Sequence, residues 1–306
     1  MLYISTRNIN DSYTAYRALH EEFAPDGGLY IPFRIPAITA EEWTEIKSRS
    51  ASGTVAMILN LFFGLRMTGN DVAEVLSSTP VSFQTINQNV VFAELWHTPD
   101  GKIDYVVDGL YCKMTGKSES PKGWAYIAIQ IALLFGIYSA NHTELRHFDV
   151  AITANVFSDV IAILYAKEMG LPVNRIICAC AEDGILWDLV NRGEFSTGKD
   201  LPDTECLIYK YFGSSGVNQY LDSCSQKTIC MFDEISSQTL VDEIYPAVVS
   251  AGRADTVISS MYSSNNYCID SDTALAYGAL QDYRASTGAN KQTLIISRKR
   301  PERIKE

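Results

Sequence analysis

Two short apolar runs joined by an apolar helical segment constrain this 306-residue chain more than any other feature. Residues 148–154 and 175–180 have the length and the composition of buried strands. The segment between them is predicted to be a helix that begins at Ser158, a suitable N-cap, and ends at Met169, just before Gly170. A strand, a helix and a strand in this order form a right-handed crossover in a parallel sheet. We therefore expect an α/β fold, with a layered parallel sheet and flanking helices.

The turn between the first strand and the helix is the first place to look for a function. In many α/β proteins the N–H groups of this turn bind a phosphate, and glycine usually allows the anion to come close. This chain has no glycine between Gly136 and Gly170. By itself the turn therefore favours a structural crossover, since a fold of this kind often persists without its chemistry. The turn consists of Ala154, Asn155, Val156, Phe157 and Ser158.

Composition excludes several classes of protein. A net charge of -11 argues against a nucleic-acid partner, because such binding depends on Lys and Arg that neutralise phosphates. Residues 124–138 approach the length of a membrane span, but Gln130 and Gly136 interrupt them, so we expect a buried core helix and no membrane. The seven cysteines lie mostly in apolar stretches, and the N-terminus does not resemble a signal peptide. We expect reduced thiols, no metal site and a cytoplasmic protein.

The chain divides into two predicted regions. Residues 1–85 are predicted to be α-rich and local, with a turn at Pro25-Asp26-Gly27-Gly28 and a capping box at Thr39 and Glu42. Residues 86–306 contain the α/β crossover. A further helix is predicted over residues 236–250.

Several motifs resemble one known family. Residues 24–32 read Ala-Pro-Asp-Gly-Gly-Leu-Tyr-Ile-Pro and follow Tyr-Ile-Ser-Thr-Arg at residues 3–7. Together they resemble the N-terminal domain of threonine synthases. The resemblance resumes at Glu-Leu-Trp-His (residues 94–97), at residues 166–172 and at residues 273–277, so it covers most of the chain.

Threonine synthases use pyridoxal 5′-phosphate (PLP) on a fold like that of the tryptophan synthase β subunit. They convert phosphohomoserine and water to threonine and phosphate. The resemblance implies a threonine-synthase-like N-terminal domain at residues 1–85. It also implies that residues 86–306 are what remains of the large domain of fold-type II PLP enzymes.

The resemblance also locates the family's catalytic lysine. The family pattern is Glu-Leu-Phe-His-Gly-Pro-Thr-Leu-Ala-Phe-Lys-Asp, and its lysine forms the Schiff base with PLP. Counted from the histidine, this position is Asp104, and Lys102 lies two residues earlier. On their own pattern, residues 90–96 and 103–107 are strand-like on either side of a Pro-Asp-Gly turn, which predicts a hairpin with Lys102 in solvent. A Schiff-base lysine needs a pocket that lowers its pKa, so Lys102 is only a weak alternative.

Other family positions have changed as well. The phosphate turn Ser-Gly-Asn-Phe-Gly corresponds to residues 154–158, where only Phe157 is kept. The threonine that partners the PLP ring nitrogen corresponds to Arg298, a fixed positive charge. The family's substrate loop, Ser-x-Thr-Ser-Gly-Asp-Thr-Gly, is not found, so we expect the small domain to be missing. The vestigial cofactor site would comprise Ala154, Asn155, Val156, Phe157, Ser158 and Arg298.

One further side chain can be activated. His97 lies between Glu94 and Asp100, and a carboxylate could polarise it. At a strand–turn junction, however, a structural histidine is the commoner case.

Three hypotheses follow from these changes. The first is a truncated, degenerate threonine-synthase-like pseudoenzyme with no cofactor and no catalytic residue. It would bind a protein, either a second copy of itself or a true threonine synthase. The second is a PLP-dependent carbon–oxygen lyase of amino-acid biosynthesis, with a rebuilt site. The third is a small-anion binding module in the vestigial cleft, which would use Arg298 and Arg300.

Overall fold

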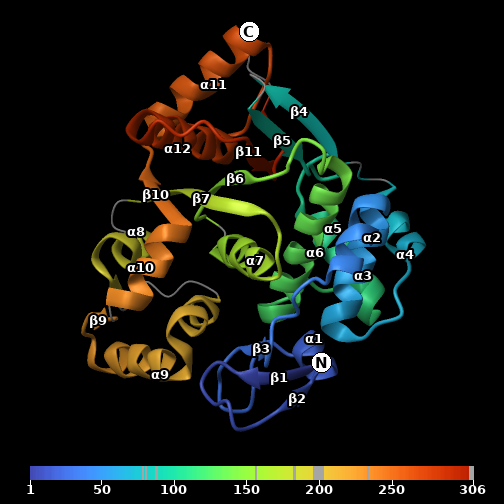
Figure 1. Ribbon diagram of the computed structural model, residues 1–306, viewed down its shortest axis with the longest axis vertical. Helices are drawn as coiled ribbons and strands as arrows, with labels where there is room; N and C mark the ends of the chain where they lie inside the picture. Colours follow the sequence, from blue (N-terminus) through green and yellow to red (C-terminus); the bar gives the residue numbers. More distant parts are fainter. Residues whose placement is uncertain are drawn as a thin grey trace.

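A six-stranded sheet forms the centre of the molecule (Figure 1). The structure is a computed structural model that describes residues 1–77, 79, 81–86, 89–155, 157–181, 184–195, 203–232 and 234–302. The strand order is β10-β7-β6-β11-β5-β4; β4 alone is antiparallel to its neighbour. The strands are β4 (Ser82–Ile86), β5 (Val90–Glu94), β6 (Phe148–Thr153), β7 (Val173–Cys180), β10 (Ile244–Val248) and β11 (Thr293–Ser297).

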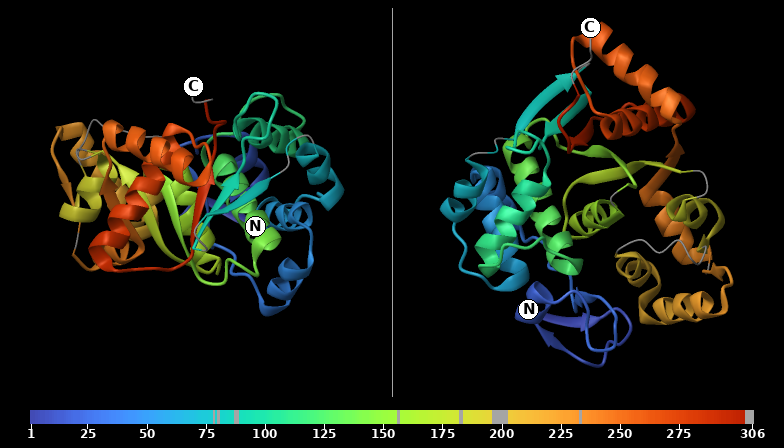
Figure 2. Two further views of the ribbon diagram at one scale, coloured as in Figure 1. Left: turned by 90° about the horizontal axis from the view of Figure 1, so that it is seen from above. Right: turned by 180° about the vertical axis from the view of Figure 1, so that it is seen from behind.

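Helices cover both faces of this sheet (Figures 1 and 2). Side chains alternate between the faces of a strand, so Val150 and Ile152 of β6 pack on one side and Ala151 packs on the other. The first face contacts α6 (Gly123–Asn141) and α7 (Phe157–Glu168); the second contacts α11 (Ala251–Asn265) and α12 (Ser271–Thr287). The predicted crossover is β6, α7 and β7. The predicted layered α/β fold is therefore confirmed.

Helix α6 is the apolar segment that approached the length of a membrane span. Within the described residues, it alone is long and apolar enough to cross a membrane, but 89% of its apolar window is buried inside the fold. It packs between α3 (Ala51–Phe63) and α7. The predicted core helix is therefore confirmed.

The N-terminal part combines a small sheet with four helices. Strands β1 (Leu2–Ser5), β2 (Tyr13–Thr14) and β3 (Tyr30–Pro32) form an antiparallel sheet in the order β2-β1-β3. The predicted turn is present, and Gly27 adopts φ +80°, which other residues rarely tolerate. Thr39 and Glu42 form the predicted capping box. The helices are α1 (Ala15–His20), α2 (Ala40–Ser48), α3 and α4 (Gly69–Leu76).

The hairpin prediction around Gly101 is wrong. Residues from Asp104 onward form α5 (Asp104–Thr115), not a strand. Ile103, Val106, Val107 and Leu110 recur at helical spacing and are all buried, so the helical period prevails over the β-branched composition. Only residues 116–122 connect α5 to α6.

The prediction of one helix over residues 236–250 is also wrong in its second half. Helix α10 (Glu234–Glu243) ends where β10 begins, and β10 pairs with β7. Pro246 is accommodated because β10 lies at the edge of the sheet. The remaining elements are α8 (Ile185–Arg192), β8 (Glu194–Phe195), α9 (Thr204–Gln226) and β9 (Cys230–Met231).

Candidate functional site

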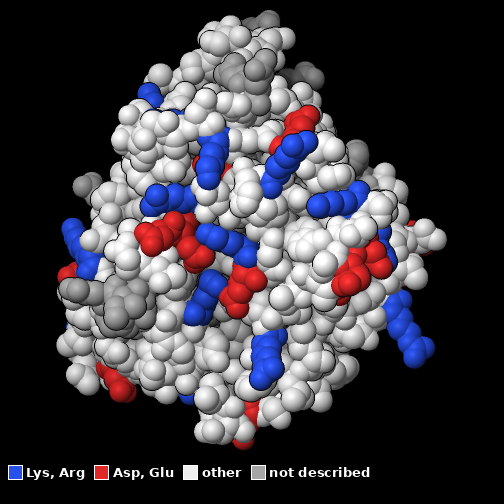
Figure 3. All heavy atoms as spheres, in the orientation of Figure 1, with Lys and Arg blue, Asp and Glu red and all other residues white. Residues whose placement is uncertain are grey.

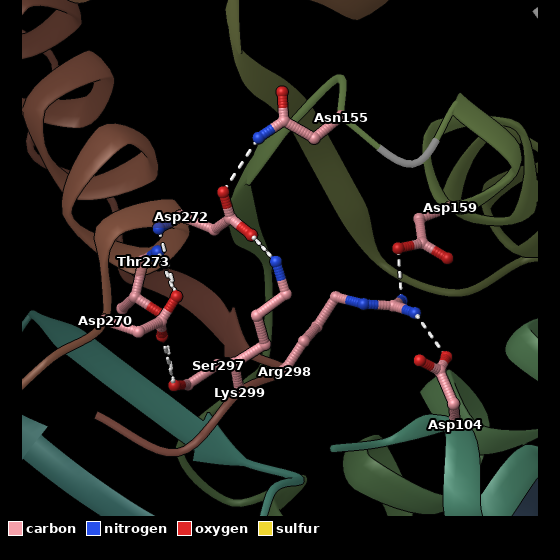
Figure 4. A network of polar contacts seen from close by, with 9 residues as sticks. All are labelled: Asp104, Asn155, Asp159, Asp270, Asp272, Thr273, Ser297, Arg298 and Lys299. Atoms are coloured by element: carbon pink, nitrogen blue, oxygen red, sulfur yellow. Dashed lines mark hydrogen bonds and ion pairs between the residues drawn. The ribbon is translucent and has the colours of Figure 1, made fainter. Parts of the chain in front are cut away.

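Polar side chains from distant segments meet at the carboxyl ends of the parallel strands, where open α/β sheets usually bind ligands (Figure 4). Asn155 follows β6, and Arg298 and Lys299 follow β11. Asp104 is the first residue of α5, and Asp272 lies in the first turn of α12. The fold therefore brings three of the predicted positions, Asp104, Asn155 and Arg298, to one edge of the sheet.

Arg298, Asp104, Asp159 and Tyr126 form what we call the Arg298 network. The guanidinium Nη1 of Arg298 pairs with the Asp159 carboxylate, and Nη2 donates to the Tyr126 hydroxyl at 3.0 Å. Asp104 Oδ1 lies 3.6 Å from Nη2, and the Tyr126 hydroxyl donates to Asp159 Oδ1 at 3.3 Å. The Arg298 side chain is only 13% exposed. Both terminal nitrogens of Arg298 thus already have protein partners.

Burial and pairing act in opposite directions on these groups. Burial lowers the pKa of Arg298, but Asp159, Tyr126 and Asp104 together more than offset this effect, so the pKa is raised overall. Burial raises the pKa of Asp159, and the charge of Arg298 opposes that rise. A buried ion pair of this kind adds little net stability, but removal of one partner leaves an uncompensated charge.

Lys299, Asp272 and Asn155 form a second set, the Lys299 network. Lys299 Nζ donates to Asp272 Oδ2 at 2.6 Å, and Asn155 Nδ2 donates to Asp272 Oδ1 at 2.8 Å. The hydrogen bond to Asp272 raises the pKa of Lys299. The side chain of Lys299 is 56% exposed, so this amine is both accessible and protonated. Asp272 therefore connects the turn after β6 to the chain after β11.

The remaining predicted positions lie around these networks. Phe157 is buried in the core, and the Ser158 hydroxyl donates to Asp203 at the start of α9. Ala154 is half-buried; its backbone N–H donates to the carbonyl of Ala179 at 2.9 Å. Val156 lies outside the described residues. Lys102 is exposed, and its backbone pairs with that of Lys299.

Sequence reasoning missed Asp159, Tyr126, Asp272 and Lys299 as members of the site. One signal was available: Asp159 and Tyr126 are rare polar side chains on helices that are otherwise almost wholly apolar. Nothing local in the sequence pairs them with Arg298, because the partners lie far apart in the chain.

His97 has the carboxylate partner that its neighbours indicated. Its Nε2 lies 2.7 Å from Glu94 Oε2, and the Tyr267 hydroxyl donates to Glu94 Oε1 at 2.7 Å. Burial raises the pKa of Tyr267. Asp100 instead accepts from the hydroxyl of Thr98.

Comparison with known proteins supplies the family context. Residues 2–79 match the family described as threonine synthase N terminus. Threonine synthase-like 1 from Homo sapiens is 27% identical over 144 residues, which covers 42% of this chain and 19% of that protein. Threonine synthase from Eremothecium gossypii is 24% identical over 162 residues, covering 53% of this chain and 31% of that protein. The chain thus matches less than a third of the length of these relatives.

Solved structures share the fold over nearly the whole chain. A PLP-bound threonine synthase from Brucella melitensis superposes with a TM-score of 0.85 at 16% identity, covering 98% of this chain and 89% of the other. Threonine synthase from yeast superposes with a TM-score of 0.82 at 14% identity, covering 98% and 87%. The chain therefore shares the fold of these threonine synthases. The predicted resemblance to the threonine synthase family is confirmed by the family match over residues 2–79 and by this shared fold.

The prediction that the protein needs no cofactor is contradicted by the same comparison. The Brucella structure holds PLP, so PLP is the cofactor that this fold indicates. The described side chains fit PLP only in part. Asn155 offers an amide and Lys299 an amine, but the position predicted for the Schiff-base lysine holds Asp104, at the start of α5. On that predicted register no lysine takes the family's position, so no reaction step is derived through PLP.

Proposed function

We propose that this chain is a threonine-synthase-like protein that has lost the conversion of phosphohomoserine to threonine. One observation carries the proposal: Asp104, at the family's lysine position, lies against Arg298, at the position of the ring-nitrogen partner. A carboxylate cannot form a Schiff base, and the permanent charge of Arg298 replaces a neutral hydroxyl. These two changes compensate each other electrostatically, which supports a site maintained for its structure.

In this proposal the chain acts by binding a protein, in the cytoplasm. The partner would be a second copy or a true threonine synthase. Residues 1–85 would form the N-terminal domain, and residues 86–306 the large-domain remnant without the small domain. The short connection between α5 and α6 supports the loss of the small domain. The intermingled acidic and basic side chains on the face in Figure 3 support a protein partner over a nucleic acid.

Turnover of phosphohomoserine by the purified chain, saturated with PLP, tests the loss of catalysis. We expect phosphate release at the background rate, whereas a true threonine synthase assayed in parallel should release phosphate readily. Release that depends on both PLP and the chain would contradict the proposal. Size-exclusion chromatography with light scattering, with and without a threonine synthase, then tests for partners.

The PLP-lyase alternative has one accessible amine near the predicted phosphate turn, that of Lys299, but the hydrogen bond to Asp272 raises the pKa of this amine and so opposes Schiff-base formation. Borohydride reduction with PLP, followed by intact-mass analysis and peptide mapping, distinguishes this alternative. A single adduct at Lys299 or Lys102, together with turnover, would establish a rebuilt site. The anion-binding alternative has less support, because Arg298 is paired and Arg300 Nη2 donates to the Thr98 carbonyl at 2.9 Å.

A further inference from the structure

A cleft of about 410 Å³ lies between the N-terminal region and α9, separate from the Arg298 network. Apolar and aromatic side chains line much of it, including Phe23, Leu29, Tyr220 and Leu221. A volume of this size is within the range of small-molecule sites. In Figures 1 and 2 the N-terminal strands and α9 lie side by side at one end of the molecule. Both regions of the chain therefore contribute walls.

One residue that lines this cleft, Asp203, has a buried carboxylate with no counter-charge among the described residues. Asp203 is 9% exposed and precedes α9, yet its side chain does not cap that helix. Its Oδ2 accepts a hydrogen bond from Ser158. No described Lys or Arg forms an ion pair with it. Burial raises the pKa of Asp203, and the nearby charge of Glu22 raises it further. Buried charges in proteins are normally paired, but the part of the chain that the structure describes supplies no cation to this carboxylate.

The neighbouring charged groups do not supply that partner. Arg7 Nη2 lies 2.6 Å from Glu205 Oε1, and the Thr6 hydroxyl donates to the same carboxylate at 2.7 Å. Glu22 pairs with Lys122 at 3.4 Å, and the Lys122 side chain is 70% exposed. Among the described residues, the other charges that line the cleft are therefore already compensated, which leaves Asp203 as a negative group among apolar lining residues.

We propose that this cleft binds a small organic ammonium compound, with its cation on Asp203 and its apolar body against Phe23, Leu29 and Leu221. The apolar walls favour an organic cation over a hydrated metal ion. Among the described residues, no group of three or more His, Cys, Asp or Glu side chains is placed to hold a metal. The site goes beyond the proposed function and does not depend on it.

Binding of three isosteric probes to the full chain tests the proposal. By calorimetry, 2-phenylethylamine should bind at least about tenfold more tightly than 2-phenylethanol, and phenylacetate should bind least, because only the ammonium can pair with the buried carboxylate. In amide NMR spectra, the amine should shift residues around Phe23 and Tyr220. Equal binding of amine and alcohol, shifts elsewhere on the molecule, or no binding would overturn the proposal.

Two variants and a matched control complete the test. Asp203→Asn should remove the preference for the amine, while Asp222→Asn, an exposed carboxylate on the same helix, should leave it unchanged. Asparagine tolerates the positive φ of 64° at position 203 and can still accept from Ser158. If Asp203→Asn does not fold, a second variant replaces Phe23, a half-exposed residue that lines the cleft. Phe23→Ala should weaken the binding of 2-phenylethylamine several-fold. Amine binding that is unchanged in both variants would contradict the site.

Discussion

Asp159 and Asp203 are both buried carboxylates close to Ser158, the first next to it in the sequence and the second bonded to its hydroxyl, but their charges are compensated differently. Asp159 pairs with Arg298 and accepts from Tyr126. Asp203 accepts from Ser158, and no described cation pairs with it. Burial raises the pKa of both. Burial alone therefore does not separate the two carboxylates; they differ in whether a described cation pairs with them. Arg298 and Asp159 compensate each other, whereas no cation among the described residues compensates Asp203.

Removal of Arg298 should produce the largest loss of stability. Arg298→Met leaves Asp159 buried without its cation, which should cost about 3–5 kcal/mol of the free energy of unfolding. Urea denaturation measures the change. Lys299→Met, which removes a more exposed ion pair, is the control and should cost less than about 1 kcal/mol. Equal costs for the two variants would show that the Arg298 network is not a compensated unit.

Removal of both partners should restore part of that loss. We expect Arg298→Met combined with Asp159→Leu to be about 2 kcal/mol more stable than Arg298→Met alone, because no uncompensated charge remains. A double-mutant cycle in urea gives the coupling. Additive losses would indicate that the two side chains act independently.

Loss of the Tyr126 hydroxyl should have a smaller effect. Tyr126→Phe removes hydrogen bonds to Arg298 and Asp159 and should cost about 1.5 kcal/mol. Gln130 lies one turn further along α6, and its buried Nε2 has no hydrogen-bond partner among the described residues. Gln130→Met is therefore the control, and thermal unfolding should find it neutral or slightly stabilised. A larger loss of stability in Gln130→Met than in Tyr126→Phe would contradict the stabilising role of the Tyr126 hydroxyl in the Arg298 network.

Asp203→Asn should change stability in the opposite direction and by the smallest amount. We expect a gain of about 1 kcal/mol in the free energy of unfolding at neutral pH. The folded-state pKa of Asp203 lies above its ordinary value, so the wild type loses stability as pH rises from that ordinary value through the raised one. The variant cannot undergo this loss. The difference should vanish below the ordinary pKa of Asp and be greatest above the raised pKa. Urea unfolding across a pH series checks this, and a destabilised variant at neutral pH would mean that Asp203 is compensated.

Local patterns in the sequence determined much of the fold. The apolar runs at residues 148–154 and 175–180 with the helix between them predicted the crossover, and Thr39 with Glu42 predicted a capping box that is present. Motif spacing also led to Asp104, Asn155 and Arg298, which the fold brings to one edge of the sheet. Periodicity and capping act within a few residues, so the sequence displays them directly.

Only the tertiary structure decided which charges are paired and which are not. The partners of Arg298 come from α5, α6 and α7, and the Asp203 cleft combines the N-terminal region with α9. Tertiary packing also made residues 104–107 helical and residues 244–248 a strand, against their local patterns. Pairing and burial depend on segments that lie far apart in the chain. A local pattern therefore cannot show whether a buried carboxylate already has its cation or still lacks one.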